Sequence, residues 1–222
     1  MVWVLILQIV LIGFLIFLFL VCVVVRIIRH YYKFPIPSFL TQVIDNPVRR
    51  RLFQTPSVIA SRMYLEPGMV VVEIGPGKGS YTKAIAQAVG PGGKVYAVDI
   101  QESVIEKLKH RIKKEGIPNI IPQVGNAYAF SFPQASIDRV FALACLPEIP
   151  EPVKVLLEVH RILKPNGLIS LAEFAPDPDY PLRRTVKMWA SETGFTLRSE
   201  YGNWFAYQLN FAKLKGCSGK KT

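Results

Sequence analysis

Between Pro67 and Lys213, short apolar runs rich in β-branched residues alternate with longer amphipathic stretches. Runs of the first kind form buried strands, and stretches of the second kind form helices with one apolar face. Strands that alternate with helices in this way build a mostly parallel sheet with helices on both faces. The pattern therefore predicts an α/β fold for this part of the chain.

The expected strands are Met69–Ile74, Lys94–Asp99, Ile120–Val124, Ile137–Leu143 and Leu168–Phe174. The expected helices between them are Ser80–Val89, Glu102–Glu115 and Pro152–Leu163, each ended by glycine or proline. A further helix follows Pro181 and runs to Thr193, and the strands Phe195–Tyr201 and Ala206–Lys213 complete the order. Because the link between these last two strands is short, they are expected to form an antiparallel hairpin at one sheet edge.

The beginning of the chain has a different character. No charged residue occurs from Val2 to Val25, and Gln8 is its only strongly polar side chain. This stretch meets the roughly 20 residues that a helix needs to cross a bilayer core. A cleavable signal peptide is the alternative, but it requires a basic start, a shorter apolar core and a small-residue cleavage site. We therefore expect residues 1–28 to form a single transmembrane anchor.

Basic residues follow the apolar run closely, at Arg26, Arg29, His30, Lys33 and Arg49–Arg51. By the positive-inside rule, the chain is expected to be a single-pass membrane protein with its C-terminal domain in the cytoplasm. The formal net charge is +11, but the basic residues concentrate beside the apolar run and in the tail. This distribution favours attraction to anionic lipid headgroups over binding to DNA.

Three further regions follow the anchor. Residues 29–66 are expected to form a basic, proline-containing connector, residues 67–214 the α/β domain, and residues 215–222 a disordered basic tail. Within the connector, Val48–Phe53 carries three arginines among apolar residues, which fits an amphipathic element on the membrane surface. A helix that caps the sheet with its basic face in solvent is the alternative.

The most informative motif is the stretch Val71–Thr82, in which a strand runs into a glycine-rich turn and then a helix. Glycines let a ligand approach the backbone, and a helix start presents free N–H groups. The dinucleotide-binding fingerprint would place its third glycine one residue later than the spacing of Gly75, Gly77 and Gly79 does. Glu73, two residues before the turn, is unfavourable beside a pyrophosphate but favours a cationic aminoacyl sulfonium.

The next two strands also end in polar residues at this edge. Asp99 ends the second strand, where a carboxylate can accept two hydrogen bonds from a ribose diol. Asn126 follows the third strand and could hold an adenine that is flanked by apolar groups such as Ile100. A plain turn residue is the alternative interpretation of Asn126.

Together these motifs resemble class I S-adenosylmethionine-dependent methyltransferases, in particular the group that includes the ubiquinone and menaquinone C-methyltransferases. The matching segments are Glu73–Gly79, Asp99, Gly125–Ala127, Ser136–Asp138 and Glu158–Gly167, within residues 65–213. The resemblance implies a Rossmann-like, seven-stranded sheet in the order 3-2-1-4-5-7-6 with strand 7 antiparallel, in agreement with the expected hairpin.

The resemblance also implies roles for individual residues. Glu73 and the Gly75–Gly79 loop would surround the methionine part of S-adenosylmethionine, Asp99 would bind the ribose, and Asn126 and Ala127 would lie at the adenine. Two departures from the family pattern stand out. Asn126 replaces the aspartate that is commonest at its place, and Lys78 stands where the loop more often has a small residue or proline.

Methyl transfer from a sulfonium is an in-line displacement with a good leaving group, so positioning and exclusion of water supply much of the catalysis. Glu148 and Tyr128 are the candidates for accepting or relaying a proton from the acceptor. An exposed loop carboxylate is the alternative interpretation of Glu148. Cys145 is interpreted as a small buried hydrophobe. The three cysteines are Cys22, Cys145 and Cys217. Their spacing suits neither a metal site nor a disulfide framework, and no metal is expected.

The expected acceptor follows from location and pocket character. The segment after the fourth expected strand lacks the Asn/Asp-Pro-Pro-aromatic sequence typical of relatives that methylate amino groups of nucleobases or glutamine. Aromatic residues near the carboxyl edge, although mostly explained by core packing, are Phe174, Tyr180, Trp204 and Tyr207. Because a tether to the bilayer favours acceptors dissolved in it, we expect a small lipophilic or membrane-lipid acceptor.

Three alternatives remain: an RNA or protein acceptor, a non-catalytic S-adenosylmethionine sensor, and a nicotinamide-linked oxidoreductase. The glycine spacing, Glu73 and the terminal hairpin disfavour the last of these. His110 and His160 are interpreted as solvated or capping residues on helices. The oligomeric state stays open.

Overall fold

The computed structural model describes residues 2–31 and 47–213. Its strands are β1 (Val70–Ile74), β2 (Lys94–Asp99), β3 (Ile120–Val124), β4 (Ile137–Leu143), β5 (Leu163–Phe174), β6 (Phe195–Gly202) and β7 (Ala206–Lys213). They form a seven-stranded sheet in the order β3-β2-β1-β4-β5-β7-β6. Strands β1 to β5 are parallel, and β7 runs antiparallel to both β5 and β6. The predicted order and the antiparallel seventh strand are confirmed.

The helices within the described residues are α1 (Val2–Tyr31), α3 (Pro47–Leu52), α4 (Pro56–Ser61), α5 (Ser80–Val89), α6 (Glu102–Glu115), α7 (Pro152–Ile162) and α8 (Arg183–Glu192), with a short 3₁₀ turn, η1, at Leu146–Glu148. Most predicted boundaries agree within two residues. The largest difference is the start of β5 at Leu163 instead of Leu168, because Leu163 already pairs with Ile137 of β4.

The sheet divides the hydrophobic core in two, because neighbouring residues of a strand point to opposite faces. Val72 and Val140 belong to a cluster that includes buried residues of α7 and α8. Val71 and Phe141 belong to a second cluster, which includes buried residues of α4 and α5. The alternation in the sequence thus places one apolar layer on each side of the sheet, as an α/β fold requires.

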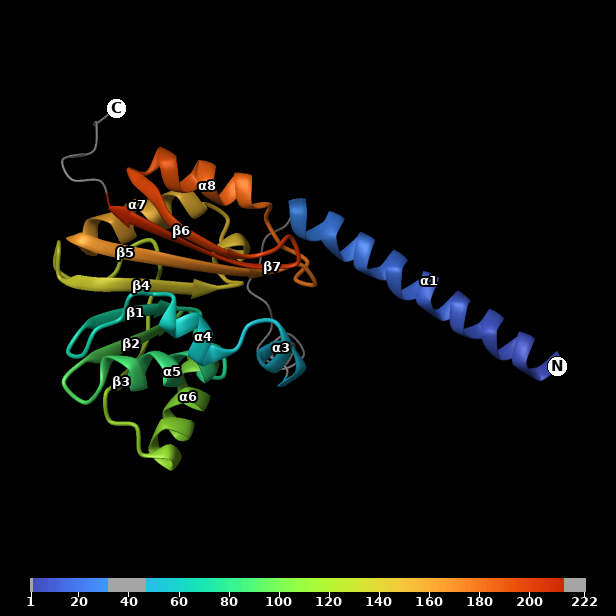
Figure 1. Cartoon of the computed structure of the whole chain (residues 1–222), viewed down its shortest axis with the longest axis horizontal. Helices are drawn as coiled ribbons and strands as arrows, with labels where there is room; N and C mark the ends of the chain where they lie inside the picture. The colour runs from blue at the N-terminus through green and yellow to red at the C-terminus, as the bar shows by residue number, and fades with distance from the viewer. Residues whose placement is uncertain (1, 32–46, 214–222) are drawn as a thin grey trace.

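Helix α1 projects away from the domain (Figure 1), and its apolar side chains are exposed along its length. Among the residues that the structure describes, no helix has both the length and the hydropathy needed to cross a membrane. The predicted transmembrane helix is therefore not confirmed. The expected disordered tail, residues 215–222, and the connector residues 32–46 lie outside the described residues.

The described part of the connector packs onto the domain. Ile59 and Ala60 of α4 are buried in the core cluster that includes residues of α5. Gln54, between α3 and α4, donates from Nε2 to the carbonyl of Glu173 at 3.0 Å and accepts at its own carbonyl from the Tyr81 hydroxyl at 2.9 Å. The residues after α3 thus bridge α5 and β5. In Val48–Phe53 itself, the side chains of Val48, Leu52 and Phe53 are exposed and Arg49 is buried, so the basic face is not wholly in solvent as the capping alternative expected.

Arginines at the end of α1 contact the loop after β5. Arg26 Nη2 donates to the carbonyls of Ala175 at 2.5 Å and Asp177 at 3.2 Å, and Arg29 forms an ion pair with Asp179. Asp177 is buried, and its Oδ1 accepts a hydrogen bond from the Asp179 backbone N–H at 2.9 Å. Burial raises the pKa of Asp177 to about 6. The loop therefore carries a buried carboxylate whose charge is unfavourable in the folded state.

Replacement of this carboxylate by an amide, Asp177→Asn, is expected to stabilise the fold at pH 7.5 and to have little effect at pH 4. An unfolded aspartate titrates near ~3.9, whereas folded Asp177 has a pKa of about 6. The folded state therefore favours the protonated form of Asp177. The stability that this form contributes is fully present below about pH 4 and is lost as the pH rises through about 6. Thermal unfolding should show the variant melting about 6–11 °C higher at pH 7.5. An equal difference at both pH values would contradict this assignment.

Candidate active site

A cavity of about 330 Å³ lies at the carboxyl ends of β1 to β4. In parallel sheets, ligands bind outside the carboxyl ends of the strands, at the point where the strand order reverses. Here that point is β1, because β2 pairs with one side of it and β4 with the other. The cavity wall includes the end of β1 and the glycine-rich loop after it, the end of β2, the loops after β3 and β4, and single residues of α3, α5 and α6.

Nearly all predicted site residues meet in this cavity. Those that line it are Glu73, Gly75, Gly77, Asp99, Ile100, Asn126, Ala127, Tyr128 and Glu148. Gly79 is the exception. It precedes α5 in the left-handed conformation with φ of 77°, and a Cβ there would lie 2.4 Å from Leu108 Cδ1. Gly79 is therefore required for α5 to start against α6, and the structure does not place it in the cavity wall.

Gly75 lies directly against Cys145. Its φ is 70°, and a Cβ at this position would lie 2.5 Å from the Cys145 sulfur. A side chain at residue 75 would therefore displace either the loop or Cys145, whereas glycine lets the loop lie against Cys145 at the cavity wall. Burial raises the pKa of the Cys145 thiol, so it stays neutral and weakly nucleophilic. This agrees with the interpretation of Cys145 as a small hydrophobe, but the side chain is half-buried at the cavity wall instead of fully buried.

The charges of the cavity favour a cation. Among the described residues that line it, Glu73, Asp99 and Glu148 are acidic and Arg49 is basic. Glu73 is buried at the end of β1. In a site of reduced polarity, a buried carboxylate attracts a positive charge more strongly than it would in water. The excess of acidic groups therefore suits a cationic ligand and opposes a pyrophosphate.

Asp99 is held in place by the backbone that follows it. Its Oδ1 accepts a hydrogen bond from the N–H of Gln101 at 2.9 Å. Burial raises the pKa of Asp99, while the backbone N–H groups of Gln101 and Ile100 act in the opposite direction. The carboxylate is thus fixed at the cavity wall, next to the exposed apolar side chain of Ile100.

Asn126 is both a turn residue and part of the cavity wall. Its Oδ1 accepts a hydrogen bond from the Tyr128 N–H at 2.9 Å, which forms the local turn that sequence reasoning held as the alternative. The Tyr128 hydroxyl in turn accepts from the Glu151 N–H at 3.1 Å. Tyr128 therefore links the loops after β3 and β4, which is a bracing role in addition to the predicted proton relay.

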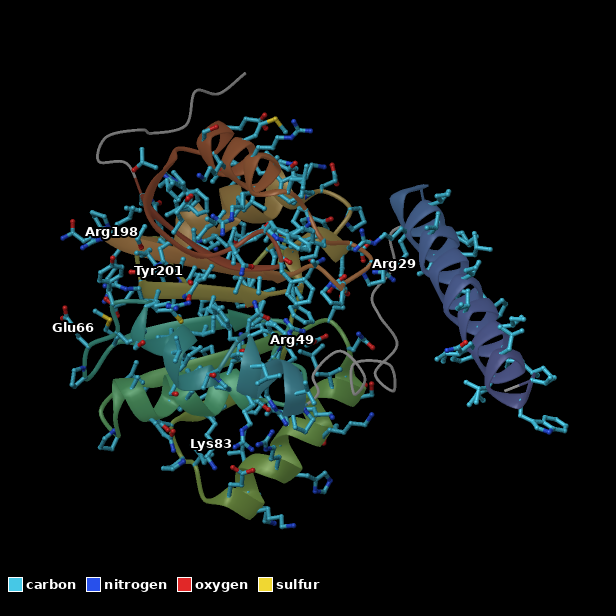
Figure 2. All side chains as sticks on the ribbon, turned by 45° about the vertical axis from the view of Figure 1, so that its right-hand side comes forward. Arg29, Arg49, Glu66, Lys83, Arg198 and Tyr201 are labelled. Atoms are coloured by element: carbon cyan, nitrogen blue, oxygen red, sulfur yellow. The ribbon has the colours of Figure 1, made fainter. Side chains whose placement is uncertain are left out.

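Arg49 was not predicted as a site residue, yet it lines the cavity and is only 2% exposed. Its Nε donates to Gln54 Oε1 at 2.8 Å, and its guanidinium lies 4.8 Å from the centroid of the Phe174 ring. Figure 2 marks Arg49 on the domain, well apart from α1. Nothing in the sequence singles out Arg49, because it is one of three consecutive arginines, Arg49–Arg51, and any of them could point inward.

Other expectations need correction. The predicted aromatic surface does not line the cavity: Phe174 and Tyr207 are buried in the core, Tyr180 is half-buried and Trp204 is exposed. His160 is half-buried instead of solvated, because its ring packs edge-on against Phe195 at 5.3 Å between centroids. The same burial lowers the pKa of His160. Glu148 is half-buried at the cavity, not an exposed loop carboxylate.

Comparison with known proteins was made on sequence and on structure. A methyltransferase domain profile matches residues 65–208. A demethylmenaquinone methyltransferase of Geobacillus stearothermophilus is 34% identical over 119 residues, which is 54% of this chain and 51% of that protein. A ubiquinone/menaquinone biosynthesis C-methyltransferase of Hydrogenovibrio crunogenus is 36% identical over 112 residues, or 50% and 44% of the two chains. This chain thus spans about half the length of these curated relatives.

A relative with a different name, a protein-L-isoaspartate O-methyltransferase of Methanothermobacter thermautotrophicus, is 31% identical over 140 residues, or 63% of this chain and 62% of that one. Among solved structures, a SAM-dependent methyltransferase from Aquifex aeolicus has a TM-score of 0.75 at 22% identity, covering 81% of this chain and 100% of that chain. That likeness concerns the fold. The profile match over residues 65–208 shows that this chain belongs to the methyltransferase domain family.

Proposed function

We propose that this chain is an S-adenosylmethionine-dependent methyltransferase that acts on a small lipophilic acceptor and is held at a membrane by α1. The observation that carries the proposal is the cavity, in which Glu73, Gly75 and Asp99 meet at the carboxyl edge of the sheet. Family membership supports the reaction class. The acceptor and the membrane attachment rest on the further arguments below.

The residues of the cavity fit S-adenosylmethionine. When bound, it supplies a methyl group on a positively charged sulfur. Glu73 would hold the cationic methionine end, and Asp99 would accept hydrogen bonds from the ribose hydroxyls. Gly75 lines the cavity, and its lack of a side chain lets the glycine-rich loop pack against Cys145. Ile100 and Asn126 would flank the adenine.

The remaining wall of the cavity is available for the acceptor. Glu148 lies on η1 after β4, and Arg49 reaches in from α3. Glu148 would accept a proton from the acceptor, and Arg49 would stabilise a developing negative charge on it. Apolar neighbours such as Ile149 exclude water from this side. The chain's own contribution is therefore to orient the acceptor, remove its proton and keep the site dry.

A lipophilic acceptor is favoured by two observations. The relatives named a demethylmenaquinone methyltransferase and a ubiquinone/menaquinone biosynthesis C-methyltransferase are 34% and 36% identical to this chain over their matched parts. In addition, α1 exposes apolar side chains such as Leu7 and Phe17 that a bilayer would cover. A protein acceptor is the second candidate, because one relative is named a protein-L-isoaspartate O-methyltransferase.

Attachment through α1 would place the catalytic domain on the cytoplasmic side, because Arg26 and Arg29 follow the uncharged run. A tethered enzyme meets acceptors dissolved in the same bilayer at a high effective concentration. The attachment therefore explains why a lipid-soluble acceptor would suit this chain better than a free one.

Removal of the Asp99 carboxylate tests the cofactor site. Asp99→Ala should weaken binding of S-adenosylmethionine about tenfold or more, because charge-assisted hydrogen bonds to the ribose are lost. Calorimetry on the full chain measures this, with far-ultraviolet circular dichroism to verify the fold. Glu102→Ala, an exposed carboxylate at the start of α6, is the matched control and should bind normally. Unchanged affinity of the Asp99 variant would refute the ribose assignment.

The role of Glu148 is tested by an isosteric change. Glu148→Gln should lower kcat about 10²-fold or more if this carboxylate removes the acceptor proton, while cofactor affinity stays unchanged. The control is Glu151→Gln, because Glu151 is exposed in the same loop and pairs with Lys154. If Glu148→Gln kept the full kcat across the pH range, Glu148 would not be the base that removes the acceptor proton.

The acceptor class is tested by label transfer. The full-length chain in native-like lipid is incubated with methyl-labelled S-adenosylmethionine and with separate lipid, RNA and protein fractions. We expect label in the lipid fraction, in small lipophilic molecules. Label found only in RNA or only in protein would overturn the acceptor class and leave the reaction type standing. The absence of label in every fraction would favour a cofactor-binding sensor.

A further inference from the structure

Exposed apolar side chains lie beside the cavity, on α3 and on the turn between β6 and β7. We call them the rim patch and define it as Val48, Leu52, Phe53 and Trp204. Leu52 is 68% exposed and Trp204 is 77% exposed. A contiguous group of large apolar side chains in water marks a surface that meets another apolar phase. The rim patch has this character.

The two halves of the rim patch are connected by ring contacts. The Phe53 ring lies 5.0 Å from that of Phe205, which lies 5.6 Å from that of Trp204, measured between centroids. On α3, Arg49 turns into the cavity. Val48 and Leu52 are one helical turn apart and share an exposed face. The rim patch is thus one surface, and it adjoins the cavity through Arg49 of α3.

The rim patch is also tied to the end of α1. Arg26 Nη2 donates to the carbonyl of Ala175 at 2.5 Å, and the N–H of Ala175 donates to the carbonyl of Phe205 at 2.7 Å. Trp204 directly precedes Phe205. Figure 1 shows α1 leaving the domain on the side where α3 lies. Two consecutive hydrogen bonds, both made by Ala175, therefore connect the end of α1 to the turn that carries Trp204.

The charge beside the rim patch is positive. Helix α3 has the sequence Pro-Val-Arg-Arg-Arg-Leu, and Arg51 is exposed next to Leu52. Tryptophan and aliphatic side chains flanked by arginine are typical of segments that lie in the headgroup region of a membrane. Arginines in such segments are attracted by anionic lipids. Both the apolar and the charged groups thus match one partner, an anionic bilayer surface.

We propose that the rim patch is a second membrane contact, which inserts into the headgroup region of an anionic bilayer and turns the mouth of the cavity towards the lipid. This inference rests on the proposed attachment of α1 to the same bilayer. With the uncharged part of α1 in the lipid, Arg26 lies at its boundary, and the hydrogen bonds through Ala175 keep Trp204 at the same level. A lipophilic acceptor then reaches the cavity without passing through water.

Quenching of Trp204 fluorescence by brominated lipids tests this contact. The chain contains three tryptophans, so Trp3→Phe and Trp189→Phe leave Trp204 as the only one. The full-length protein is reconstituted into phosphatidylcholine vesicles with about a quarter of phosphatidylglycerol, with and without bromine on the acyl chains. The matched control replaces all three tryptophans by Phe and carries Leu157→Trp, because Leu157 is exposed on α7. Flotation of the vesicles reports attachment separately.

We expect both proteins to float with the vesicles, and Trp204 alone to lose more than about half of its fluorescence. Flotation without quenching of Trp204 beyond the Leu157→Trp control would overturn the rim patch as a membrane contact and leave the attachment by α1 intact. Failure of both proteins to float would overturn the attachment itself and the inference with it. Shielding of Trp204 from aqueous acrylamide without bromolipid quenching would point to a protein partner and likewise contradict the proposal.

Discussion

The pairing of β1 with β2 on one side and β4 on the other is the constraint on which the rest of the structure depends. Because these strands are parallel, their carboxyl ends meet at one edge, and the connections leave a gap between them. Glu73, Asp99 and the segment that carries Glu148 reach this gap only because each follows or ends one of these strands. The glycine-rich turn can lie close to Cys145 because Gly75 has no side chain. The cavity is therefore a consequence of strand order combined with a few local residues.

The N-terminal segment completes the site. Arg49 enters the cavity from α3, while Gln54 contacts both α5 and β5 through hydrogen bonds. Arg26 and Arg29 attach the end of α1 to the loop after β5. Arg49 of α3 is thus part of the cavity wall, whereas α1 contacts the loop after β5. A membrane-attached enzyme with this architecture would orient its acceptor entrance through the same residues that attach it.

Much of the fold follows from the sequence, because the apolar periodicity is regular. The bounds of β2, β3, β4, β7, α5 and α6 agree with the prediction at both ends. The start of β5 does not, since a helix was predicted to include Leu163, whereas this residue already pairs with Ile137 of β4. The half-buried position of His160 was missed for a related reason: its contact is with Phe195 of β6, far away in the sequence.

The residues of the candidate site also fall into two groups, those that could be placed from the sequence and those that could not. Residues attached to a strand end, such as Glu73 and Asp99, could be placed from the sequence, because strand ends in a parallel sheet share an edge. Arg49 could not, since its inward direction depends on how the connector packs against Phe174. Gly79 was assigned to the ligand from the family resemblance, but a side chain there would meet Leu108, and only the packing of α5 against α6 reveals this.

The central claim is that this cavity is shaped and charged for a sulfonium nucleoside. An experimental structure of the full chain with S-adenosylhomocysteine, the product of the proposed reaction, tests it most directly. The account predicts the ribose hydroxyls on Asp99, the amino acid end beside Glu73 and Gly75, and the adenine between Ile100 and Asn126. A ligand bound elsewhere, or a cavity that closes over its own side chains and excludes the nucleoside, would contradict it.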